Sequence, residues 1–135
     1  MPEEKDAEMS ETKCRILLVD DDPFVGEMLA MILEDEGYSI ETAENGHDAL
    51  EIFRSTPDIG LLISDMNMPG MSGLELIAAI RAASPEIPVI LLTGTEDANL
   101  GHEADEYLLK DENMQDTIIE YVGKVLASKA LKTNN

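Results

Sequence analysis

Short apolar runs alternate with helix-like stretches along most of the chain, and this alternation limits the fold more than any other feature. The runs stop abruptly at polar residues, glycine or proline, and apolar residues recur at helical spacing between them. Continuous apolar runs are typical of parallel strands buried on both faces. Strand and helix repeated five times predict an α/β fold, a doubly wound parallel sheet with helices on both faces. The expected strands are 15–19, 38–43, 59–64, 89–92 and 105–109.

The expected helices lie between these strands, and capping residues set their limits. Pro23 suits a first helical turn, and Gly37 ends that helix. The next helix stops before Pro57, the third covers 74–83, and the last begins after Asn113 as its N-cap. The third helix is expected to turn inward Leu74, Ile77, Ala78 and Ile80.

Length and charge narrow the class of protein. The 135 residues suit one domain, expected at 13–131, between a disordered acidic tail at 1–12 and a frayed end at 132–135. A net charge of −20 argues against nucleic acid or an anionic membrane as a direct partner. No apolar stretch is long enough to span a membrane, and the acidic start lacks a signal segment, so a cytoplasmic protein is expected.

Polar residues follow four of the five predicted strands. Asp20 and Asp21 follow the first, Asp65 ends the third, Thr93 ends the fourth and Lys110 follows the fifth. Parallel strands bring their carboxyl ends to one edge of a sheet, which is where open α/β sheets bind ligands. The sequence therefore predicts a single site built from strand ends that are distant along the chain.

The residue types at this edge point to phosphoryl chemistry. Clustered carboxylates repel one another, and Mg²⁺, which prefers oxygen ligands, relieves that repulsion. Asp65 is then a candidate nucleophile toward phosphorus, because carboxylates form aspartyl phosphates. Lys110 could neutralise one phosphoryl oxygen and the hydroxyl of Thr93 could bind another. No His or Cys cluster favours zinc.

Over roughly residues 13–127 the chain resembles the receiver domain of two-component response regulators. The resemblance rests on Asp20-Asp21, on Asp65 within the segment 64–73, and on Thr93, Tyr107 and Lys110. It implies a flavodoxin-like (βα)5 fold. It also implies that Asp65 accepts a phosphoryl group from a histidine kinase or a phosphotransfer protein. The chain is expected to act alone, as a chemotaxis-regulator-like protein that switches its binding of a downstream protein target.

The resemblance also assigns roles to the residues around the phosphoacceptor. It implies that Mg²⁺ is held by Asp20, Asp21, Asp65 and the backbone carbonyl of Asn67. It further implies that Thr93 moves toward the phosphoryl group and that Tyr107 changes its packing in response. Such a domain catalyses only its own phosphorylation and dephosphorylation, so a separate enzymatic activity is not expected.

Two departures from the receiver pattern carry expectations of their own. Asp111 stands after Lys110 where receivers usually have proline, so the turn into the last helix should be built differently. Only sixteen residues, 94–109, separate Thr93 from Lys110, and Gly101 weakens a helix among them. A shortened or irregular fourth helix is therefore expected.

Two other functions remain open from the sequence. One is a degenerate receiver that binds its partners without phosphorylation, which Asp111 and the short fourth helix favour. The other is a small phosphohydrolase with an aspartyl nucleophile. Such enzymes would be expected to have a second acid two residues after the nucleophile, where this chain has Asn67.

Overall fold

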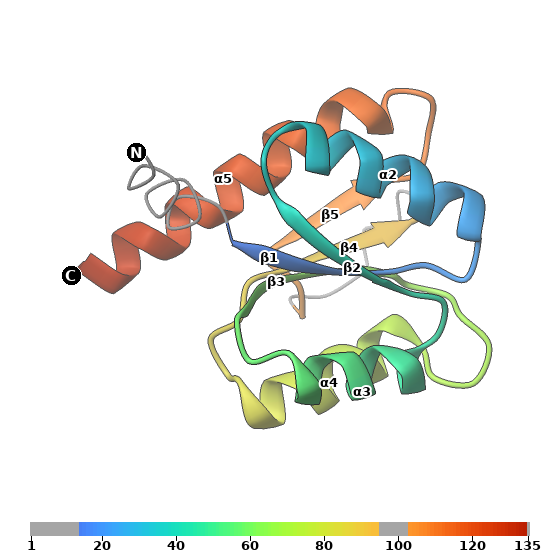
Figure 1. Ribbon diagram of the computed structural model, residues 1–135, viewed down its shortest axis with the longest axis horizontal. Helices are drawn as coiled ribbons and strands as arrows, with labels where there is room; N and C mark the ends of the chain where they lie inside the picture. The colour runs from blue at the N-terminus through green and yellow to red at the C-terminus, as the bar shows by residue number, and fades with distance from the viewer. Residues whose placement is uncertain (1–13, 95–102, 135) are drawn as a thin grey trace, which may run out of the picture.

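Five parallel strands form one sheet, in the order β2-β1-β3-β4-β5, with helices on both of its faces (Figure 1). The computed structural model describes residues 14–94 and 103–134, except for the side chains of 129–134. The predicted doubly wound sheet is therefore confirmed. Its elements are β1 (Arg15–Val19), α2 (Pro23–Asp35), β2 (Ser39–Ala43), α3 (Gly46–Ser55), β3 (Ile59–Asp65), α4 (Gly73–Ala83), β4 (Val89–Thr93), β5 (Glu106–Leu109) and α5 (Met114–Asn134).

Alternating side chains of the strands feed two separate hydrophobic clusters. Ile16 and Ile63 face α2 and α5, which lie on one side of the sheet in Figure 1. Leu17 and Leu62 face α3 and α4 on the other side. Because both faces are covered, the central strands are buried along their length, as their continuous apolar sequences predicted.

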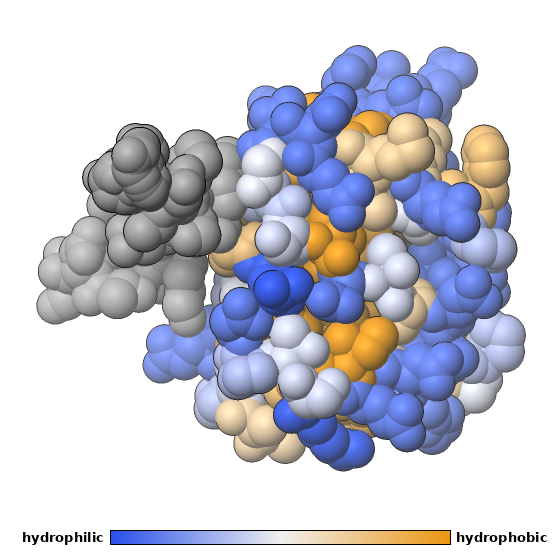
Figure 2. Space-filling view, viewed as in Figure 1, coloured by the Kyte–Doolittle hydropathy of each residue, from blue (hydrophilic) through white to orange (hydrophobic). Residues whose placement is uncertain are grey.

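The face of the molecule seen in Figure 2 is mostly polar. On the face seen in Figure 2, hydrophilic side chains cover most of the surface and hydrophobic ones show only in small patches. In the described part of the chain, no helix combines the length and the apolar character that a membrane-spanning segment requires.

Local sequence sets the helix ends next to the site. Asp22 caps α2 by accepting a hydrogen bond from the Phe24 N–H at 3.0 Å, with Pro23 in the first turn. Gly37, at φ 101°, ends α2, and Tyr38 N–H returns to the carbonyl of Leu33 at 3.2 Å. This pairing is a Schellman motif, as the predicted role of Gly37 requires.

Three predictions about helices meet different outcomes. In α4, Leu76 is buried where Ala78 was predicted, and Ala78 is exposed, so the predicted inward face was partly wrong. The backbone of α5 is helical to Asn134, and its end projects past the sheet in Figure 1, while the frayed end expected at 132–135 stays a prediction. The expected short fourth helix and the acidic N-terminal tail lie outside the described residues.

The amino end of α4 packs directly on the end of β3. Gly73 N–H donates to the carbonyl of Met66 at 2.9 Å. A Cβ on Gly73 would lie 2.9 Å from Met66 Cα and closer still to the carbonyl oxygen of Asp65. Only glycine fits there without moving the backbone of the segment that carries Asp65.

Gly73→Ala should therefore destabilise the fold by about 2 kcal/mol, because the added methyl group meets backbone rather than a flexible side chain. Urea denaturation followed by circular dichroism measures the change. Gly26→Ala is the matched control: it lies inside α2 with nothing within 4 Å of the added carbon, and should stabilise by about 0.5–1 kcal/mol. Equal effects from the two substitutions would contradict the close packing of Gly73.

Candidate phosphoacceptor and metal site

The carboxyl ends of four strands deliver the predicted site residues to one edge of the sheet. Asp20 directly follows β1, and Asp65 and Thr93 are the last residues of β3 and β4. Lys110 directly follows β5, and its N–H donates to the carbonyl of Thr93 at 2.8 Å. The strand pairing therefore holds this edge together by backbone hydrogen bonds.

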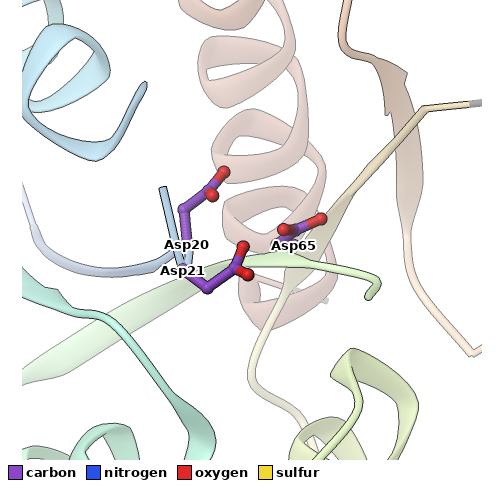
Figure 3. A group of neighbouring side chains, drawn as sticks. All are labelled: Asp20, Asp21 and Asp65. Atoms are coloured by element: carbon purple, nitrogen blue, oxygen red, sulfur yellow. The ribbon is translucent and has the colours of Figure 1, made fainter. Parts of the chain in front are cut away.

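Asp20, Asp21 and Asp65 form an acidic triad typical of a Mg²⁺ site. One carboxylate oxygen of each lies within 4.8 Å of the others, and Figure 3 shows the three side chains gathered where β1 and β3 end. Asp20 and Asp65 are 2% and 6% exposed, whereas Asp21 is exposed. Two buried carboxylates and one at the surface suit Mg²⁺, which binds few carboxylates and keeps several waters.

Both carboxylate oxygens of Asp20 have close partners in the site. Its Oδ1 accepts a hydrogen bond from the Asp22 N–H at 2.9 Å. Its Oδ2 is buried and forms an ion pair with the ammonium of Lys110 at 2.9 Å. The fit of this site to Mg²⁺ therefore rests on the grouping of the three carboxylates.

Lys110 is the positive charge of the site. Its Nζ lies 2.9 Å from Asp20 Oδ2 and 3.2 Å from Asp65 Oδ2. Burial lowers the pKa of Lys110, but the close contact with Asp20 and the charges of both carboxylates outweigh burial and raise it overall. The ammonium is therefore fixed in its charged form between the two buried acids.

The carboxyl group of Asp65 is hard to ionise. Burial raises its pKa, the negative charge of Asp20 raises it further, and Lys110 offsets only part of this, leaving the pKa of Asp65 at about 6. A perturbed carboxyl group in a cluster of charges is typical of a functional site. A bound cation would favour the ionised, nucleophilic form.

Thr93, Asn67 and Tyr107 are the other residues that were predicted to act at this site. Thr93 is 3% exposed at the end of β4. The backbone N–H of Asn67 donates to Asp65 Oδ1 at 3.4 Å, a long hydrogen bond that places Asn67 beside the acid. Tyr107 is half-buried on β5 against the cluster formed with α3 and α4. The metal role of the Asn67 carbonyl and the switch roles of Thr93 and Tyr107 remain predictions.

Asp111 forms the turn between β5 and α5, at the position where receivers usually have proline. Its carboxylate accepts a hydrogen bond from the Asn113 N–H at 2.9 Å, and its carbonyl accepts one from the Met114 N–H at 3.1 Å. The described residues contain no cis peptide bond. Asp111 thus closes an Asx turn just before α5, and Asn113 is the residue that directly precedes the helix.

The sequence analysis missed two residues that support the site. Gly73 was read only as loop punctuation, although its missing side chain sets the distance between α4 and the end of β3. Arg81 was not recognised as a polar anchor, although it forms an ion pair with Asp105, the residue just before β5, and β5 leads to Lys110. The sequence signal that could have identified Arg81 was the scarcity of basic residues, because the chain has only nine lysines and arginines.

Comparison with known proteins assigns the family. The response regulator receiver domain pattern matches residues 16–122, and the chain belongs to this family. It is 42% identical over 85 residues to the transcriptional regulatory protein GlrR of Escherichia coli, a match that spans 63% of this chain and 19% of GlrR. It is 36% identical over 110 residues to the probable transcriptional regulatory protein TcrX of Mycobacterium tuberculosis, spanning 77% of this chain and 46% of TcrX.

A solved structure extends the comparison to the site. The response regulator TrrA of Thermotoga maritima, in complex with Mg²⁺-BeF, is 43% identical, with a TM-score of 0.75 over 83% of this chain and 98% of that chain. The chain is therefore a phosphorelay response-regulator receiver domain with an acidic Mg²⁺-type pocket. Receiver domains are phosphorylated by histidine kinases.

Magnesium should raise the melting temperature of the chain, because an ion that binds only the folded state stabilises it by mass action. At a free Mg²⁺ concentration 100-fold above the Kd the gain should be about 2.7 kcal/mol. Asp21→Asn should remove most of this gain without harming the metal-free fold, since Asp21 is exposed. Thermal melts with and without Mg²⁺ measure it. Asp35→Asn, an exposed control on α2, should respond to Mg²⁺ like the parent chain.

Proposed function

We propose that Asp65 is the phosphoacceptor of this receiver and that Lys110, Thr93 and Tyr107 convert its phosphorylation into altered partner binding. The observation that carries the proposal is the contact of Lys110 Nζ with both Asp20 and Asp65, at 2.9 and 3.2 Å. This contact places one positive charge beside the carboxylate that would receive a phosphoryl group. The exposed Asp21, grouped with these two acids, completes the set of carboxylates that could hold a cation.

In the proposed reaction, a carboxylate oxygen of Asp65 attacks the phosphorus of a phosphohistidine. The new O–P bond forms as the N–P bond breaks, and the imidazole leaves with a proton. Lys110 contacts one phosphoryl oxygen, and the hydroxyl of Thr93 a second. Mg²⁺ held by Asp20, Asp21, Asp65 and the Asn67 carbonyl supplies the remaining charge neutralisation.

The switch follows from the charge that phosphorylation adds. A phosphoryl group brings up to two negative charges and strong hydrogen-bond acceptors to an edge that has one lysine in contact with the acids. Lys110 would then leave its contact with Asp20 for the phosphoryl oxygens, and Thr93 would turn toward them. Tyr107 lies on β5, the strand that ends just before Lys110. Its side chain would repack, and the affinity of the chain for a downstream protein would change.

The proposed donor is a histidine kinase or a phosphotransfer protein, and the proposed setting is the cytoplasm. The net charge of −20 supports a protein partner rather than nucleic acid or an anionic membrane. The target downstream is a protein that reads the repacked surface around β5.

Intact-mass measurement after incubation with acetyl phosphate and Mg²⁺ tests the proposal. We expect one phosphoryl adduct on the parent chain and none on Asp65→Asn. Beryllofluoride binding, read by tyrosine fluorescence, covers the case in which the adduct hydrolyses quickly. A folded parent chain that neither gains mass nor binds beryllofluoride would refute the proposal and leave a phosphorylation-independent binding module. Steady turnover of a generic phosphate ester would instead indicate a hydrolase.

A further inference from the structure

Arg81, in the last turn of α4, binds the segment that leads into β5. Its guanidinium donates to the carbonyl of Glu103 and to the carboxylate of Asp105, at 2.6 and 3.0 Å. It also donates to the carbonyl of Ile87 at 3.0 Å. A planar guanidinium can satisfy several acceptors at once, so one side chain ties α4 to two other segments.

Asp105 extends this contact into the sheet. Its Oδ2 accepts the hydrogen bond of Arg81 and also one from the Val89 N–H, at 2.8 Å. Its own N–H donates to the carbonyl of Val89 at 2.9 Å. Arg81 and Asp105, which we call the Arg81–Asp105 clamp, thus fix the start of β5 to the start of β4 and to the end of α4.

The clamp encloses a hydrogen bond of Tyr107. Ala104 lies between the two clamped residues Glu103 and Asp105, and its N–H donates to the hydroxyl of Tyr107 at 3.4 Å. The ring of Tyr107 packs in the hydrophobic cluster shared with α3 and α4. The position of the tyrosine hydroxyl therefore depends on a backbone segment that Arg81 holds.

The other end of α4 lies against the phosphoacceptor. Gly73 donates to the carbonyl of Met66, and a Cβ at Gly73 would strike the backbone of Asp65. A helix of these eleven residues is about 16 Å long and is stiff over that length. One rigid element thus contacts the loop after Asp65 at its first residue and the Ala104 segment at its Arg81 end.

We infer that Arg81 is a positioning residue for the switch: through the Arg81–Asp105 clamp it holds Tyr107 in the packing described above and opposes the change that phosphorylation brings. The inference rests on the proposed switch role of Tyr107. Loosening the clamp removes part of the preference for the unswitched state. The switched state, which phosphorylation or beryllofluoride favours, then becomes more populated. Beryllofluoride, which binds that state, therefore binds more tightly.

Fluorine NMR of the full chain labelled with 3-fluorotyrosine tests this inference. The chain has three tyrosines, and Tyr107→Phe identifies the signal of Tyr107. Arg81→Lys keeps the charge but cannot bind three acceptors in a plane. We expect it to shift the Tyr107 signal toward its position in the Mg²⁺–beryllofluoride complex and to tighten beryllofluoride binding by about three- to ten-fold. Asp105→Asn, which retains an acceptor for Val89, should give a smaller shift in the same direction.

Arg15→Lys is the matched control, because Arg15 also binds two carboxylates, Glu41 and Asp58, but lies on β1, which β3 separates from β4 in the sheet. It should leave the Tyr107 signal unchanged. Folded Arg81→Lys and Asp105→Asn variants with parental Tyr107 signals and beryllofluoride affinity would overturn the role of the clamp while leaving Asp65 as the phosphoacceptor. A parental Tyr107 signal that beryllofluoride does not move would overturn the switch role of Tyr107, and the inference with it.

Discussion

Asp65→Asn should be more stable than the parent chain at pH 8 in the absence of divalent metal, by about 2 kcal/mol. The pKa of Asp65 rises from 3.8 to about 6 in the folded protein, chiefly because the group is buried and lies near Asp20. The folded chain therefore binds this proton more tightly than the unfolded chain does. Stability contributed by the protonated form is full below pH 3.8 and is lost as the pH rises through 6. The shift corresponds to at most about 3 kcal/mol, which the neutral amide avoids.

Urea denaturation from pH 3.5 to pH 8, with a chelator present, measures this effect. The advantage of Asp65→Asn should shrink steadily below pH 6 and vanish near pH 3.5. Asp35→Asn, which replaces an exposed acid, should stay within about 0.5 kcal/mol of the parent throughout. If the advantage of Asp65→Asn persisted undiminished at pH 3.5, its origin could not be the ionisation of Asp65.

Lys110→Met should lower the stability of the metal-free chain by about 3 kcal/mol at pH 8. Methionine keeps an unbranched apolar stem but leaves Asp20 and Asp65 as buried acids without a counterion, and removing one partner of a buried ion pair is costly. Magnesium should restore part of the loss, because it supplies positive charge to the same carboxylates. Urea denaturation with and without Mg²⁺ gives both quantities.

The double variant Lys110→Met/Asp65→Asn provides the internal check. Asp65→Asn should stabilise the Lys110→Met chain by more than it stabilises the parent chain, because the side chains of residues 65 and 110 interact directly. Lys124→Met removes an exposed ion pair with Glu106 and should have a much smaller effect. Additive effects of the two site substitutions would show that Lys110 does not stabilise the buried charge of Asp65.

The sheet and its reactive edge could be predicted because both depend on short-range patterns. Apolar runs such as 59–64 can only be central strands, and parallel strands must end together. Asp65 and Lys110 were thus brought together by topology alone. The buried face of α4 was harder to predict, because apolar residues lie on most sides of that helix. Their periodicity therefore does not decide whether Leu76 or Ala78 is buried.

The remaining features depend on tertiary distances that no local pattern encodes. The close approach of Gly73 to the backbone of Asp65 follows from how α4 docks on β3. The partners of Arg81 come from two segments, around Ile87 and at 103–105, and the second meets Arg81 only in the folded chain. The size of the pKa shift at Asp65 required its burial, since the same cluster of acids in solvent would titrate more nearly as free carboxyl groups.

The pairing of β1 with β3 has a consequence for access to the reactive carboxylate. α2 leaves β1 toward one face of the sheet, whereas α4 follows β3 on the opposite face, so the helices diverge on either side of Asp20 and Asp65. A molecule as bulky as another folded protein could thus approach end-on, along the strand axis, between these two helices. The geometry suits a macromolecular phosphate donor at least as well as a small metabolite.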